Sequence, residues 1–327
     1  MHSPNTQLHI RNDSNERNTD EALRALLKRV RAIEIRAKKY VNDHAQGAYH
    51  SRFKGRGMAF EESRVYVPGD DPRHVDWNVT ARTGDLYVKQ FVEERELTLL
   101  IGVDVSGSFS VGSQGQIKRQ LAAEAAALMA FSAMKSGDKV GLLLFSDRVE
   151  RIIRPKKGRA HVLRLLREIL SCEPEGKSTD LSLAFETMTH LCRQRAIAVL
   201  ITDLLHPRSK GIFADDASAS LGAMEKPLKV LSRRHELMIL QLSDRLEQEL
   251  PDVGLLNVLD PETGREVLVD TSDPNVRSTY TRRMGLERER YLNRVQKLGI
   301  ENLALECGDD SSMALIKFMK RRSKRGA

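Results

Sequence analysis

The chain has 327 residues, of which 40% are hydrophobic and 30% are charged. This balance can fill a core and keep a solvated surface, so it excludes a largely disordered chain. No run reaches the roughly 18 consecutive apolar residues that cross a bilayer. The net charge of +8 favours contact with nucleic acid, anionic lipid or an acidic protein.

The N-terminus and the cysteines indicate a compartment. Residues 1–18 are polar, lack the apolar region of an export signal and are predicted to be disordered. Cys172, Cys192 and Cys307 are far apart, odd in number and without metal-type spacing. They are typical of reduced core thiols, so we expect a cytoplasmic location.

The first regular element is predicted to be a helix over about 19–41, with Thr19 or Asp20 as its cap. Its apolar residues recur at helical spacing. The segment 47–84 is dense in glycine and proline, which argues against regular structure there. Short extended pieces are expected at 64–67 and 86–92.

From Leu97 onward, continuous apolar runs alternate with helical segments. Apolar strands separated by helices predict a parallel sheet that is covered on both faces. The predicted strands are 97–103, 140–145, 196–201, 237–242 and 303–305, with a short edge strand at 152–153. The predicted helices are 116–134, 160–171, 181–193, 220–233, 275–298 and 311–322.

Polar oxygen-bearing side chains follow two of the predicted strands. Asp104 and Asp203 each end an apolar run, and ligands of open α/β sheets bind outside the carboxyl ends of strands. Ser106 and Ser108 follow Asp104 at alternate positions, so the three side chains can point the same way. Thr179 precedes another predicted helix.

These oxygens suit a hard cation such as Mg²⁺, or alternatively Mn²⁺ or Ca²⁺. A set with few carboxylates leaves one coordination position that a partner's carboxylate can complete. Gly107, Phe109 and the loop 204–212 are expected to form the rim of such a site. The alternative is a cluster of caps and turns without metal.

The pattern Asp104-x-Ser106-x-Ser108, followed by Thr179 and Asp203, resembles the metal-ion-dependent adhesion site of von Willebrand factor A domains. The resemblance implies a Rossmann-like α/β fold with a mostly parallel central sheet flanked by helices. It also implies that the hydroxyls bind the metal, with the aspartates bound directly or through water.

A second resemblance is carried by Gly55-Arg56-Gly57, Glu61, the run 64–77 (RVYVPGDDPRHVDW), Ala81-Arg82 and Val88-Lys89-Gln90-Phe91. Over about 45–245 the chain resembles the DUF58 family. That resemblance implies a partner of the MoxR-type AAA+ ATPase class and a chaperone-like role in maturing client proteins.

The expected domain organisation combines these observations. Residues 1–18 form a disordered N-terminus, and 19–96 hold the N-terminal helix and a loop-rich extension with the DUF58 signature. Residues 97–327 form the von Willebrand factor A-like domain, with a β-hairpin insertion near 255–270.

The signature run holds the only tryptophan, Trp77, among several charged residues. One interpretation is a rigid brace, with Asp76 and Arg82 buried in hydrogen bonds and with Trp77 and Tyr66 packed on the sheet. The other interpretation is a surface on which a partner docks. Both remain open at the level of the sequence.

An enzyme is not expected. A phosphate-binding loop ending at Lys177-Ser178 would need glycine where Ser171 stands. A dehalogenase-type phosphoryl site at Asp104 would need a second aspartate where Ser106 stands. The histidines form no evident triad, so no nucleophile has a positioned base.

The sequence therefore predicts a non-enzymatic, metal-dependent protein-binding adaptor that works with a MoxR-type AAA+ ATPase and a client protein. A basic nucleic-acid-binding protein is the alternative, although aromatics are only 5% of the chain. A metal-dependent hydrolase is a weaker alternative. Peripheral membrane contact stays open, because the tail 317–325 concentrates basic residues.

Overall fold

The computed structural model describes residues 12–42, 59–92, 96–110, 117–176, 178–204, 217–259, 266–308 and 310–325, and structural statements concern these residues. Several predicted features lie outside them: the first part of the N-terminus (1–11), Gly55–Gly57, Lys177, most of the 204–212 loop and the 260–264 turn.

The first helix, α1 (Asn12–Tyr40), begins earlier than the predicted cap at Thr19 or Asp20. It packs against α4 (Lys118–Lys135) and α5 (Arg159–Ser171) through an apolar stripe that includes Ile33. Buried Glu34 accepts two hydrogen bonds from Arg159, at 2.5 and 2.9 Å. Helix α1 is thus part of the hydrophobic core of the sheet domain.

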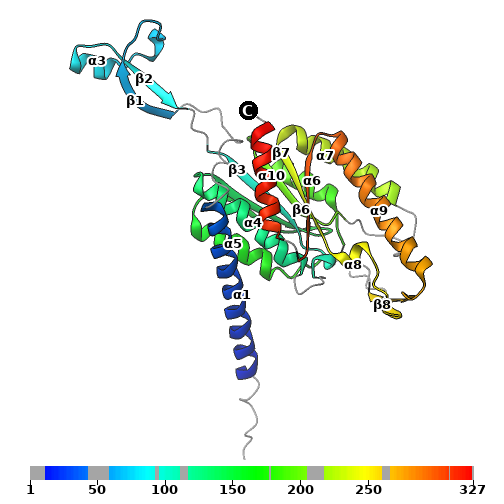
Figure 1. Cartoon of the computed structure of the whole chain (residues 1–327). Coiled ribbons are helices and arrows are strands. Elements are labelled where there is room, and N and C mark those ends of the chain that lie inside the picture. The colour runs from blue at the N-terminus through cyan, green and yellow to red at the C-terminus, as the bar shows by residue number, and fades with distance from the viewer. Residues whose placement is uncertain are drawn as a thin grey trace, which may run out of the picture.

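A small separate unit follows, which we call the signature unit (residues 59–92). It is made of β1 (Ala59–Val65), η2 (Pro72–His74), α3 (Trp77–Thr83) and β2 (Tyr87–Val92). The two strands pair antiparallel, near the extended pieces predicted from sequence. Helix α3 was not expected in this glycine-rich segment. It forms because the Asp76 carboxylate caps the N–H groups of Asn78 and Val79, and Gly84 ends it at φ 83°. Figure 1 draws this unit apart from the main sheet.

The main sheet has six strands in the order β10-β7-β6-β3-β4-β5. All neighbouring pairs are parallel except β4 with β5, which forms an antiparallel edge. Nearly every residue of β3, β4, β6 and β7 is buried, which explains their unbroken apolar runs. The strands are β3 (Thr98–Asp104), β4 (Lys139–Phe145), β5 (Val149–Lys156), β6 (Ile197–Thr202), β7 (Glu236–Ser243) and β10 (Glu301–Glu306).

Helices cover both faces of this sheet, as predicted. One core layer joins the sheet to α1, α4, α5 and α10 (Ser311–Arg325), and the other joins it to α6 (Leu181–Leu191), α7 (Ala217–Arg234) and α9 (Pro274–Lys297). Alternate residues of one strand serve the two layers: Leu99 and Ile101 face the first, and Leu100 faces the second. The predicted fold class is confirmed. None of the described helices is long and apolar enough to cross a membrane.

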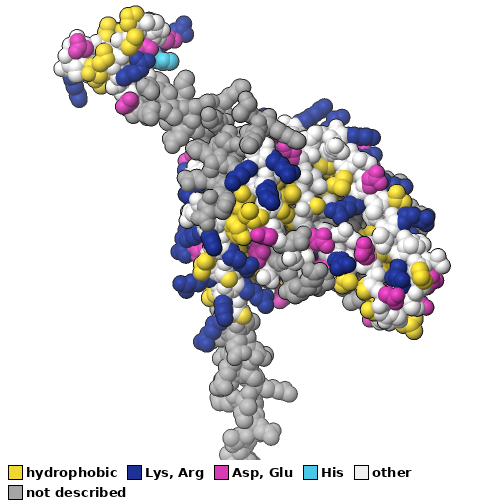
Figure 2. All heavy atoms as spheres, viewed as in Figure 1, with side chains coloured by type: hydrophobic (Ala, Val, Ile, Leu, Met, Phe, Trp, Pro, Cys, Tyr) yellow, Lys and Arg dark blue, Asp and Glu magenta, His cyan; other side chains and the backbone are white. Residues whose placement is uncertain are grey.

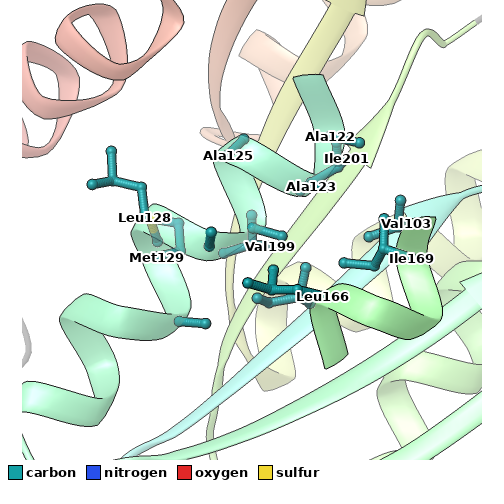
Figure 3. Close-up of a cluster of buried hydrophobic side chains, with 14 of the residues drawn as sticks. Val103, Ala122, Ala123, Ala125, Leu128, Met129, Leu166, Ile169, Val199 and Ile201 are labelled. Carbon is teal, nitrogen blue, oxygen red and sulfur yellow. The ribbon is translucent and has the colours of Figure 1, made fainter. Parts of the chain in front are cut away.

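Helix α4 is the centre of the first layer. Figure 3 shows its alanines lying against Val199 and Ile201 of β6, with Leu166 and Ile169 of α5 beside them. Most of the helix is buried, because α1, α5 and α10 cover the sides that the sheet leaves free. A helix buried on all sides needs small apolar residues throughout, which accounts for its alanine-rich sequence.

Between β7 and α9 the chain forms a short helix, α8 (Arg245–Gln248), and then two antiparallel strands, β8 (Leu255–Leu259) and β9 (Glu266–Asp270). These strands occupy the segment where the sequence predicts a hairpin. Helix α8 begins with a capping box in which Asp244 and Glu247 satisfy each other's backbone N–H groups. This box holds Glu247 at the carboxyl end of β7.

The packing of α1 generates a prediction. Ile33 is 2% exposed in the core, whereas Ile35 of the same helix is 62% exposed. We expect Ile33→Ala to lower the free energy of unfolding by about 2–5 kcal/mol, because it leaves a cavity between α1 and its neighbours. Ile35→Ala should change it by less than about 0.5 kcal/mol. Urea denaturation of both variants is the measurement, and equal losses would contradict the docking of α1 on the core.

Candidate functional site

Two adjacent parallel strands bring the predicted carboxylates together. Strand β3 ends at Asp104, and its neighbour β6 ends at Thr202, directly before Asp203. Because the strands run parallel, both aspartates lie at the carboxyl edge of the sheet. Asp104 is 0% exposed and Asp203 is 3% exposed, so neither carboxylate is hydrated as it would be in water.

The loop after β3 returns its hydroxyls to the same place. The Asp104 Oδ1 atom accepts the N–H of Ser106 at 3.0 Å, which turns the chain into η3 (Gly107–Ser110). The hydroxyls of Ser106 and Ser108 then lie 3.2 Å apart. Ser108 donates to Asp203 Oδ2 at 2.7 Å, so the loop bridges the two aspartates.

Thr179 completes the predicted set. It stands before α6, whose cap is the next residue, Asp180. The Thr179 hydroxyl lies 3.4 Å from Asp104 Oδ2, and the side chain is buried. The structure thus brings together Asp104, Ser106, Ser108, Thr179 and Asp203, although they come from three separate segments. Phe109, expected at the rim, is instead fully buried.

Sequence reasoning missed a hydroxyl in the same cluster. Thr202 Oγ1 donates to Asp104 Oδ2 at 3.0 Å and accepts the N–H of Leu204 at 3.1 Å. Leu204 has φ 60°, a left-handed conformation that a leucine rarely adopts. The Thr202 hydroxyl therefore both solvates Asp104 and stabilises the sharp turn after Asp203. The sequence signal that could have identified Thr202 is a hydroxyl at the end of an apolar run.

Sequence reasoning also missed a cation. Lys118, the first residue of α4, is 0% exposed, and its Nζ lies 2.7 Å from Asp203 Oδ2. The same ammonium contacts Glu247 Oε1 of α8. It also lies 5.5 Å from the centroid of the Phe109 ring, on which a cation is stabilised. Side chains from three different segments thus surround this lysine.

Burial and charge perturb the ionisation of these groups. Burial, followed by the neighbouring charge of Asp203, raises the pKa of Asp104 to about 7. Burial also raises the pKa of Glu247. For Lys118, burial acts to lower the pKa, but the charges of Asp203 and Glu247 outweigh it and raise that pKa above its usual value. The ammonium is therefore charged at neutral pH.

The chemistry of the donor set fits a hard divalent cation. The site offers three hydroxyls and two carboxylates, all oxygen donors of the kind that Mg²⁺, Mn²⁺ and Ca²⁺ take. Lys118 pairs with Asp203 and Glu247, and Asp104 is a third carboxylate beside Asp203, so the cluster keeps an excess of negative charge when all four groups are ionised. Among the described residues, this cluster included, no group of three or more His, Cys, Asp or Glu side chains is placed to hold a metal, so a metal here would depend on the hydroxyls as well as on the two aspartates.

The signature segment is held by internal ion pairs and hydrogen bonds. Arg64 binds Asp70 through two nitrogens at 2.7 and 2.6 Å, and this pairing lowers the pKa of Asp70 to about 2. Asp76 accepts the Ser63 hydroxyl at 2.8 Å. Trp77, however, is 69% exposed, and Arg82 is exposed as well. The brace prediction is correct for Asp76 and wrong for Trp77 and Arg82.

The segment around Gly176, whose sequence is similar to the end of a phosphate-binding loop, binds a carboxylate of the chain itself. The carboxylate of Glu150 accepts the N–H groups of Glu175 and Gly176 at 3.1 and 2.9 Å. A side chain at Gly176 would meet Ser146 Oγ at 2.2 Å, so glycine is required there for packing. A carboxylate of the chain thus occupies the N–H groups that a phosphate would need.

The geometry defines a mostly parallel α/β domain with an oxygen-rich site at the carboxyl ends of its strands. The chain belongs to the family described as "Protein of unknown function DUF58", whose model matches residues 62–290. It is 31% identical over 302 residues to an uncharacterized protein of Mycobacterium tuberculosis (strain ATCC 25618 / H37Rv), covering 91% of this chain and 90% of that protein. The predicted family is confirmed.

Solved structures give weaker likenesses. BatB from Bacteroides thetaiotaomicron, a conserved hypothetical protein, matches with TM-score 0.42 and 12% identity over 70% of this chain and 99% of that chain. A von Willebrand factor type A structure from Catenulispora acidiphila matches with TM-score 0.36 and 8% identity over 73% and 44%.

The Thr202 hydroxyl gives the second prediction. Thr202→Val keeps the shape but removes a hydrogen bond to a buried carboxylate, so we expect the free energy of unfolding to fall by about 1.5–3 kcal/mol. Thr202→Ser keeps the hydroxyl and should lose much less. Denaturant unfolding in EDTA compares the two variants. Equal stability of the valine and serine variants would show that the hydroxyl does not support Asp104.

The signature unit gives the third prediction. Asp76→Ala removes the cap of α3 and the bond to Ser63, and we expect local stability to fall by about 0.5–2 kcal/mol. Arg82→Ala should leave it unchanged, because Arg82 is exposed. Hydrogen–deuterium exchange of the amides in 59–92 is the measurement. Faster exchange in the Arg82 variant than in the Asp76 variant would reverse our assignment of the cap.

Proposed function

We propose that this protein is a non-enzymatic, metal-dependent protein-binding adaptor that works with a MoxR-type AAA+ ATPase in the maturation of client proteins. The single observation that supports it best is the convergence of five buried oxygen-bearing side chains at one edge of the sheet. They are Asp104, Ser106, Ser108, Thr179 and Asp203.

The proposed ion is Mg²⁺, with Mn²⁺ or Ca²⁺ as substitutes, held by the three hydroxyls and the two aspartates. When bound, it would supply a directional, charge-assisted contact for an aspartate or glutamate of the partner. The residues of this chain keep the site pre-formed. Ser108 joins the loop to Asp203, and Thr202 fixes the turn behind it.

The proposal treats the protein as non-enzymatic because of the groups that touch the two aspartates. Among the contacts of Asp104 and Asp203 are hydroxyls, a backbone N–H and the Lys118 ammonium. A lysine with a raised pKa is a poor general base. This chemistry suits binding better than hydrolysis.

The signature unit supports the protein-binding part of the proposal. Trp77 is 69% exposed, and Val65, Val67 and Leu86 are each about half exposed. The unit therefore presents large apolar side chains on a scaffold held by the Arg64–Asp70 ion pair. Exposed aromatic and apolar residues on a rigid support are typical of docking surfaces.

The MoxR-type ATPase is proposed as the partner because of the family resemblance. A cytoplasmic location is part of the proposal, and the three free cysteines are consistent with it. Nucleic-acid binding remains the second candidate because of the net charge of +8. On the face shown in Figure 2, however, Lys and Arg side chains alternate with hydrophobic and acidic ones rather than forming a continuous band.

Affinity capture from the native host tests the proposal and is the fourth prediction. We expect the intact protein to retain an AAA+ ATPase in Mg²⁺ and to lose most of it in EDTA. Ser106→Ala should also lose it, because a hydroxyl ligand is removed while the fold is kept. Ser132→Ala is the matched control, since Ser132 is a buried serine of α4 whose hydroxyl donates to the Leu128 carbonyl of the same helix.

The outcomes separate the parts of the proposal. Equal recovery in Mg²⁺, in EDTA and with Ser106→Ala would keep the adaptor and remove the metal from its mechanism. Recovery of no ATPase under any condition would reject the adaptor. Recovery of nucleic acid instead would favour the second candidate.

A further inference from the structure

We propose that Lys118 is a tethered competitor of the metal: its ammonium neutralises Asp203 in the ion-free protein, and ion binding transfers Lys118 from Asp203 to Glu247. The inference rests on the metal site of the proposed function. It adds a residue that sets the affinity of that site and a defined movement that accompanies binding.

The contact geometry places the ammonium on a predicted ligand atom. Asp203 Oδ2 accepts the Ser108 hydroxyl at 2.7 Å and Lys118 Nζ at 2.7 Å. The oxygen on which the lysine sits is therefore the one that also touches a hydroxyl ligand. An ion that takes this oxygen meets a positive charge at hydrogen-bond distance from it.

The surroundings make that conflict severe. The side chains of Lys118 and Asp203 are both 0% exposed, so little water lies between the charges to screen them. A divalent ion and an ammonium on one carboxylate oxygen repel each other strongly under such conditions. Either the ion is excluded or the ammonium moves.

Glu247 provides the place to which the ammonium can move. It already contacts Lys118 through Oε1, while its Oε2 accepts the N–H of Asp244 at 3.1 Å. The capping box thus keeps this carboxylate beside the lysine whatever happens at Asp203. Leaving Asp203 does not create a buried cation without a partner, which would be very unfavourable.

Helix formation does not explain why a lysine stands at this position of α4. It is the first residue of the helix, where the macrodipole disfavours a cation. It is also among the largest fully buried side chains of the described chain. The lysine is stabilised there by the carboxylates of Asp203 and Glu247.

A titration of the purified, metal-stripped full chain with Mn²⁺ tests the inference, by calorimetry and by the ion-induced shift in melting temperature. We expect Lys118→Met to bind Mn²⁺ about tenfold more tightly than the natural chain, within the range of typical coupling between sites. Its melting temperature should fall without the ion and rise more on adding it. Lys139→Met is the matched control. Lys139 lies away from the site and forms an ion pair with Glu96, in which Nζ and Oε2 are 2.8 Å apart.

A double-mutant cycle separates transfer from a simple change in charge. In the natural chain, Glu247→Gln should weaken Mn²⁺ binding, because Lys118 loses its alternative acceptor. In the Lys118→Met background, the same change should have a clearly smaller effect, because nothing is transferred. Purely additive effects would reject the transfer, since independent field effects add.

Further outcomes of the titration support or overturn the inference. Equal or weaker Mn²⁺ binding by Lys118→Met would overturn the competition, as would the absence of binding in every variant. If Lys118→Met does not fold, unchanged or tighter binding by Glu247→Gln overturns the inference, and weaker binding supports it. Because the titration contains no partner protein, its result is independent of whether an ATPase is captured.

Discussion

The structure depends on two aspartates that the parallel sheet places side by side in its buried interior. Strands β3 and β6 are neighbours, so Asp104 and Asp203 emerge at the same edge, both almost fully buried. Ionised carboxylates in such a place must be compensated by hydrogen bonds or by positive charge. The hydroxyls of Ser108, Thr179 and Thr202 and the ammonium of Lys118 provide this compensation.

This requirement connects the site to the layers around it. The loop after β3, the start of α4, the start of α6 and helix α8 all contribute a group to one cluster. Each of these segments follows or precedes a buried element, so its position is set by the core. A change in the charge at Asp203 therefore acts first on Lys118 and α8, which contact it directly or through one residue.

The parts that could be predicted from sequence are those with a local signal. Unbroken apolar runs indicate buried parallel strands, and Asp104, Ser106 and Ser108 are close in the chain at alternate positions. Thr179 and Asp203 could be added because each follows or precedes a predicted element. Lys118 and Glu247 gave no such signal: their contacts span 85 and 129 residues, and a lysine in a Lys-Arg pair is typical of a solvated surface.

The prediction for the signature unit was partly wrong for a different physical reason. Its glycines and prolines indicate turns, and Asp76 could be recognised as a polar anchor, but nothing local distinguishes a tryptophan that packs from one that is presented to solvent. The Arg64–Asp70 ion pair and the Asp76 cap hold the unit without Trp77. Because the unit is held together without Trp77, this side chain can remain exposed, and the prediction that it is buried was wrong.

A tethered cation would also explain how such a site can depend on its partner. In the proposed scheme, an ion that binds alone must displace Lys118 from Asp203, so its intrinsic affinity is low. A partner carboxylate that completes the coordination adds a favourable contact only in the displaced state. By thermodynamic linkage, ion and partner then strengthen each other's binding by the same factor. The buried lysine would thus offset part of the negative charge of the ion-free site and make ion and partner bind together.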